Sequence, residues 1–127
     1  MMKYSFEKLE VWQDSRELTK LVYSITRTFP DDEKFGITNQ MRRAAISVAS
    51  NIVERSYRTT GKDKSYFMTF AYSSLMELLN QTIVSLDLKY VNEEQYNEIR
   101  NQIEKVSNQL NALTKYFKSL HPNAITP

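Results

Sequence analysis

The chain has 127 residues, a formal net charge of +2 and no cysteine, so disulfide bonds, zinc–thiolate sites and thiol nucleophiles are excluded. Its two glycines and three prolines are few for a fold rich in strands and loops. No apolar run reaches the ~20 residues of a membrane span. We expect one cytoplasmic domain over residues 1–127, with a single hydrophobic core and a frayed tail after residue 121.

The first half of the chain predicts two helices in which apolar residues recur every three or four positions. The first runs from about residue 9 to residue 28, and Trp12 is expected to pin the N-terminal segment against the bundle. It ends at the Phe-Pro pair of residues 29–30, because proline cannot continue a helix. The second spans about residues 37–57, and Thr38 is its expected N-cap.

The second half of the chain predicts two longer helices. The segment 59–61 separates the second helix from a third over about residues 62–89, whose apolar residues cover most of its circumference. A helix that is apolar nearly all round is buried on more than one side. The fourth spans about residues 92–120, and Asn92 with Gln95 predicts a capping box at its start. Short connections favour antiparallel neighbours, so the expected fold is an all-α, up-down-up-down four-helix bundle.

The second helix carries two apolar strips about 120° apart on a helical wheel. Met41, Val48 and Ile52 belong to the core strip, and a monomeric bundle does not need the other. Scattered apolar residues are ordinary on protein surfaces, but the third helix shows the same excess, which favours a subunit interface. The candidate interface residues are Ile46, Ala49, Val53, Phe70, Tyr72 and Met76.

A polar ridge on the second helix has residues spaced three or four apart. Its members are Gln40, Arg43, Ser47, Asn51 and Glu54. One interpretation is a solvated face with an internal ion pair between Glu54 and Arg58. The other is a network between helices that includes Glu77 and Arg42 or Arg43. Acid–base catalysis needs a group with a pKa near neutrality, and the ridge offers only Glu54.

Basic residues suggest a nucleic-acid-binding rim as an alternative function. The rim candidates are Lys34, Arg42, Arg43, Arg55, Arg58, Lys62 and Lys64. The last four bracket the loop between the second and third helices, with Tyr57 and Tyr66 nearby. Cations bind phosphates and aromatic rings stack on bases. The simpler interpretation is solubilising charge, which Glu54 and Asp63 dilute.

Three segments resemble one protein family in order and spacing. The first, FEKLEVWQ at residues 6–13, resembles the opening of the 23S rRNA intervening-sequence proteins, the S23-like four-helix bundles. The second, FPDDEKFGI at residues 29–37, resembles their helix junction. The third, QMRRAAISVASNIVE at residues 40–54, resembles their central signature. The family pattern has glycine where this chain has Arg55. On the wheel, Arg55 faces the core strip, so we expect it at or beyond the end of the bundle.

The resemblance implies an up-down bundle that assembles into a ring, typically a pentamer, which agrees with the surplus apolar strips. Two kinds of function remain open. The first is an oligomeric scaffold or adaptor whose partner is a protein. The second is an accessory protein that binds RNA or DNA through the basic rim. The family name records where some of its genes lie and does not establish a ribosomal role.

Catalytic, metal and cofactor sites are not predicted. The helical HEPN ribonucleases need arginine and histidine on one helix, whereas the single histidine, His121, follows the last predicted helix. The Glu-x-x-His pairs of di-iron bundles and glycine-rich phosphate loops are missing as well. We therefore expect no enzyme activity, no cofactor and no small-molecule substrate.

Overall fold

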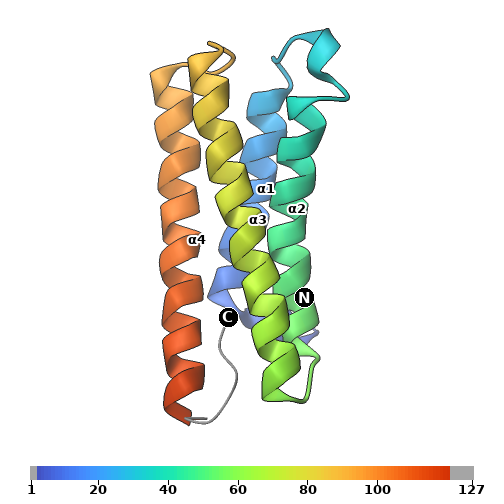
Figure 1. Cartoon of the computed structure of the whole chain (residues 1–127), viewed down its shortest axis with the longest axis vertical. Helices are drawn as coiled ribbons and strands as arrows, with labels where there is room; N and C mark the ends of the chain where they lie inside the picture. Colours follow the sequence, from blue (N-terminus) through green and yellow to red (C-terminus); the bar gives the residue numbers. More distant parts are fainter. Residues whose placement is uncertain (1–2, 121–127) are drawn as a thin grey trace.

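A computed structural model describes residues 3–120, and within this range the secondary structure is entirely helical. The four α-helices run alternately up and down along the long axis (Figure 1). They are α1 Glu10–Thr26, α2 Ile37–Ser56, α3 Gly61–Asp87 and α4 Glu93–Leu120. Two short 3-10 helices, η1 Ser5–Lys8 and η2 Asp31–Glu33, precede α1 and α2. Each α-helix end lies within two residues of its predicted position, and the all-α up-down bundle is confirmed.

The helices form a closed square in which each packs against two neighbours. α2 packs against α1 and α3, and α4 packs against the same two helices. Within residues 3–120, α1 and α3 are not adjacent, and neither are α2 and α4, so these pairs lie diagonally across the bundle. The bundle therefore has four side faces, which we name α1/α2, α2/α3, α3/α4 and α4/α1 after the helices that flank them.

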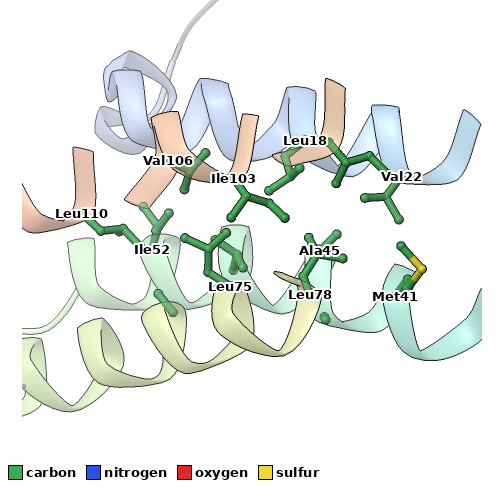
Figure 2. Close-up of a cluster of buried hydrophobic side chains, with 14 of the residues drawn as sticks. Leu18, Val22, Met41, Ala45, Ile52, Leu75, Leu78, Ile103, Val106 and Leu110 are labelled. Carbon is green, nitrogen blue, oxygen red and sulfur yellow. The ribbon is translucent and has the colours of Figure 1, made fainter. Parts of the chain in front are cut away.

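The core runs along the bundle axis and takes side chains from all four helices (Figure 2). The labelled residues are Leu18, Val22, Met41, Ala45, Ile52, Leu75, Leu78, Ile103, Val106 and Leu110, each at most 1% exposed. Burying a large aliphatic side chain contributes about 1.5–3 kcal/mol, so these residues hold the helices together. None of the helices within residues 3–120 is long and apolar enough to cross a membrane.

The helix starts use side-chain caps at two of the three interhelical connections. Asn92 and Gln95 form the predicted capping box, with each side-chain oxygen accepting from the other residue's backbone N–H at 2.8 and 3.0 Å. Thr60 caps α3 by accepting from the Asp63 N–H at 3.1 Å. The predicted N-cap Thr38 is wrong: α2 begins at Ile37, so the Thr38 side chain lies inside the first turn, only 7% exposed.

The N-terminal segment is held against one end of the bundle by aromatic contacts. The Phe6 ring meets the Trp12 ring edge-on, with centroids 5.0 Å apart, and meets the Tyr57 ring at 6.2 Å. Gln13 Nε2 also donates to the Glu7 carbonyl oxygen at 2.8 Å. Trp12 is therefore the packing anchor that the sequence predicted, and η1 closes the end of the bundle where α2 finishes.

Candidate functional site

A groove of about 540 Å³ lies along the α2/α3 face, and the polar ridge of α2 forms one wall. The groove is lined by Phe35, Asn39, Gln40, Arg43, Ala44, Ser47, Ser74, Glu77 and Gln81. The opposite wall comes from α3, where Ser74, Glu77 and Gln81 share one face because they are spaced three and four apart. Phe35 is 86% exposed at one end of the groove. The ridge is thus half of a two-helix surface rather than an isolated face.

Hydrogen bonds within the ridge join α2 to α3. The hydroxyl groups of Ser47 and Ser74 lie 2.8 Å apart, and Asn51 Nδ2 donates to the Ser47 carbonyl oxygen at 2.8 Å. Farther along, Arg58 binds the Glu54 carboxylate at 2.5 Å on the surface. The ion-pair interpretation is therefore correct for the end of the ridge, whereas its middle is an interhelical network built from Ser47, Ser74 and Asn51 rather than from Glu77 and an arginine.

The expected link from Glu77 to Arg42 is wrong, because Arg42 points to the other side of α2. Its Nε donates to Thr26 Oγ1 at 2.9 Å, and its guanidinium lies 4.6 Å over the Tyr23 ring. Consecutive residues of a helix differ by about 100° in direction, so Arg43 faces the groove instead. No ion pair joins Arg43 to Glu77 within residues 3–120, although both line the groove.

The groove presents hydrogen-bonding and charged groups that suit a polar partner. Arg43 supplies a guanidinium and Glu77 a carboxylate, while Gln81 Oε1 is buried without a hydrogen-bond partner. No histidine lies among the described residues, and no group of three or more carboxylate or histidine side chains within them is placed to hold a metal ion. The groove therefore offers hydrogen-bonding groups together with one positive and one negative charge.

The predicted interface residues fall on three faces of the bundle. Ile46, which is 43% exposed, flanks the α1/α2 face with the half-buried Ala49 and Val53, on the side of α2 where Arg42 contacts α1. Tyr72, 37% exposed, lines a groove of about 310 Å³ on the α3/α4 face. Met76 is half-buried and lies four residues along the same helix flank.

Phe70 does not join Tyr72 or Ile46. Two residues along a helix differ by about 200° in direction, so Phe70 faces the α2/α3 side while Tyr72 faces α4. Its ring packs on Tyr66 with centroids 4.7 Å apart, and both side chains are about half exposed. The structure therefore places two apolar strips on opposite faces, α1/α2 and α3/α4, and a separate aromatic pair at the α2–α3 end.

The seven basic rim candidates do not form one rim. Arg55, Arg58, Lys62 and Lys64 gather around the loop between α2 and α3. Lys34 precedes α2, and at 1.5 Å per residue it lies about 30 Å away at the other end of the helix. Arg42 is bound to α1 and Arg43 lines the groove. Only the four residues at the loop form a local basic cluster.

Arg55 and Lys64 are the partly buried members of this cluster. Burial lowers the pKa of the Arg55 guanidinium, and burial followed by the charge of Arg55 lowers the pKa of the Lys64 ammonium. The Arg55 guanidinium lies 5.6 Å over the Phe117 ring of α4. Arg55 sits in the last turn of α2, which agrees with the expected position at or beyond the end of the bundle. The pairing with Phe117 could not be predicted, because it depends on the register of α4.

Comparisons with known proteins agree with the fold and the signature. No curated protein matches the chain. A solved structure of a protein with unknown function from the S23 ribosomal protein family of Bacteroides thetaiotaomicron is similar, with a TM-score of 0.73 and 20% identity, covering 81% of this chain and 96% of that one. The model of the 23S rRNA-intervening sequence protein family matches residues 7–112, so this chain belongs to that family.

Proposed function

We propose that this chain is a non-enzymatic bundle that assembles with copies of itself and serves as a scaffold or adaptor for a protein partner. The single observation that carries the proposal is the pair of apolar strips on opposite faces. Ile46, Ala49 and Val53 flank the α1/α2 face, and Tyr72 and Met76 flank the α3/α4 face. All four helices fill the core, and of these five strip residues only Met76 packs against it.

Strips on opposite faces favour head-to-tail association. A two-fold dimer uses the same patch on both subunits, whereas two different patches on one subunit generate a ring or a filament. If the α1/α2 strip of one copy packs on the α3/α4 strip of the next, each subunit buries both. The family resemblance adds an expected ring of five. Such a ring leaves the α2/α3 groove of every subunit open to a partner.

The partner surface in this proposal is the α2/α3 groove. It combines Arg43, Glu77 and Gln81 with the exposed ring of Phe35. Charged and amide groups beside one aromatic anchor are typical of protein interfaces, in which a few side chains carry most of the binding energy. Repetition around a ring would strengthen a modest contact through effective concentration. The proposal assigns the groove to recognition and the apolar strips to assembly.

Two complementary variants test the head-to-tail association. Ile46→Glu disables the α1/α2 strip and Tyr72→Glu disables the α3/α4 strip, so each variant alone should be monomeric by light scattering. Mixed together, they should form a heterodimer through the one pair of intact strips. Asn108→Glu, exposed on α4 and directed away from the core, is the matched control and should assemble like the unmodified chain. Variants that both stay assembled would refute the assignment of the strips.

A pull-down separates a protein partner from a nucleic-acid-mediated one. The tagged chain and its Phe35→Ala, Glu77→Ala variant are each incubated with lysate, with and without nuclease. A partner that survives nuclease and is lost with the groove variant agrees with the proposal. A partner lost with nuclease alone contradicts it. Helix content by circular dichroism should be equal for both chains, since Phe35 and Glu77 are exposed.

A further inference from the structure

Two cations lie side by side where α2 ends and α3 begins, without a carboxylate between them. Lys64 Nζ donates to the Arg55 carbonyl oxygen at 3.3 Å, and both side chains are partly buried. Together with Ser65, Met68, Thr114 and Phe117 they line a recess of about 10 Å³, which holds one water molecule at most. No salt bridge involves Arg55 or Lys64 within residues 3–120, whereas four other cations of this range are paired.

The nearest carboxylates in sequence do not neutralise this pair. Glu54 is bound to Arg58 at 2.5 Å, on the exposed side of the same helix end. Asp63 is exposed, and its direction differs from that of Lys64 by about 100°. The ring of Phe117 attracts the Arg55 guanidinium, but an aromatic face carries only a partial negative charge and does not neutralise the cation. The pair therefore keeps an excess of positive charge.

Two partly buried cations side by side destabilise the folded state unless a bound partner compensates for their charge. Withdrawing a cation from water has a cost, and placing a second cation beside it adds repulsion. Burial lowers the pKa of Arg55, and burial together with the charge of Arg55 lowers the pKa of Lys64. Side chains whose placement lowers the stability of the fold are expected at functional sites. An anion bound to both cations would relieve the repulsion and recover the lost hydration.

We infer that Arg55 and Lys64 form a binding site for a phosphate-class oxyanion at the α2–α3–α4 end of the bundle. The guanidinium fork fits two oxygens of a tetrahedral anion, and the ammonium adds a compact third donor. Because the recess admits no more than a water molecule, the anion lies over it, open to solvent. The site belongs to one chain, so its test does not depend on the proposed assembly.

The surroundings allow the phosphate to be free or part of a polynucleotide. Lys62 and Lys118 are exposed near the pair, and Lys118 shares the neighbouring α3/α4 groove with Thr114. The exposed rings of Tyr57 and Tyr66 lie on the same end of the bundle. A single-stranded phosphodiester chain would use these extra cations and rings, whereas inorganic phosphate would use Arg55 and Lys64 alone.

The first test titrates inorganic phosphate at constant ionic strength and follows the thermal unfolding temperature of the full chain. The unfolding temperature should rise with phosphate relative to chloride, since a ligand that binds only the folded state stabilises it. Arg55→Gln and Lys64→Gln should each weaken the apparent affinity at least tenfold. Lys62→Gln, two residues from Lys64, about half a helical turn away and exposed, should change it less than twofold. Equal phosphate responses in all four proteins, or none in any, would overturn the site.

Two further measurements distinguish free phosphate from a polynucleotide as the ligand and test whether Arg55 is needed for folding. A fluorescent twelve-residue uridylate oligomer should bind more tightly than phosphate and be displaced by it if the ligand is a polynucleotide. Binding no tighter than phosphate assigns the site to the free anion, and binding unaffected by Arg55→Gln overturns the site for polynucleotides. Arg55→Met should unfold no earlier than the unmodified chain without phosphate. A large loss there would make Arg55 a structural residue and contradict the inference.

Discussion

The hydrogen bond between Ser47 and Ser74 offers a direct measure of the contact between α2 and α3. Ser74 is 7% exposed, and its hydroxyl lies 2.8 Å from that of Ser47. A neutral hydrogen bond contributes about 0.5–1.5 kcal/mol, and leaving one buried hydroxyl unpaired costs about 1–3 kcal/mol. Alanine favours helix by roughly 0.5 kcal/mol over serine. We therefore expect Ser47→Ala and Ser74→Ala each to destabilise the chain by about 1 kcal/mol.

A double-mutant cycle separates the interaction energy between Ser47 and Ser74 from the helix-propensity terms. Chemical denaturation of the two single variants and the double variant should give a coupling energy of about 1 kcal/mol, because the helix-propensity terms cancel. Ser50→Ala and Ser73→Ala, both exposed on the same two helices, are the matched controls and should leave stability equal or slightly raised. A coupling energy below about 0.3 kcal/mol would show that the two hydroxyls are neighbours without a significant bond.

Three further predictions concern the bundle itself. Leu78→Ala, at a fully buried position, should lower the free energy of unfolding by about 2–5 kcal/mol in urea denaturation, and a smaller loss would place Leu78 outside the core. Lys89→Gly should raise the free energy of unfolding by about 0.4–1 kcal/mol, because Lys89 has φ of 63° and glycine adopts this conformation without strain. A lower free energy of unfolding would contradict the left-handed conformation at this position. The pKa of Glu7 is lowered by the backbone N–H groups of Tyr4 and Lys3, so the contribution of this carboxylate to docking the N-terminal segment is present above pH 4.5 and is lost as pH falls through its lowered value. Fluorescence of Trp12, the single tryptophan, should report this change at acid pH, and an equal change in Glu7→Gln would assign it to another group.

The sequence predicted the fold because local signals agreed with one another. Apolar residues repeat every three or four positions in α1 and α4, and the Asn92–Gln95 capping box marks where α4 begins. The one wrong cap, Thr38, shows the limit of such signals. A threonine near a helix start suits both the N-cap and a buried first turn. Because Gly36 occupies the N-cap position of α2, Thr38 falls in the first turn.

The surfaces were less predictable because they depend on which helices are neighbours. A wheel shows that Arg42 and Arg43 point in different directions, but only the packing of α1 beside α2 shows that Arg42 binds Thr26. Of the partner wall of the α2/α3 groove, only Glu77 was predicted from the sequence, although Ser74 and Gln81 recur with it at helical spacing. Contacts between residues far apart in the chain, such as Arg55 with Phe117, leave no local signal.

The central claim is that apolar strips on opposite faces join copies of this chain head to tail. The most direct test is the mass of the purified chain in solution, measured by light scattering over a range of concentrations. The account predicts a defined multiple of the 15.0 kDa chain, and a ring of five would have a mass of about 75 kDa. A mass of one chain at every concentration would contradict the claim. Ile46 and Tyr72 would then be ordinary exposed apolar residues on the surface of a monomer.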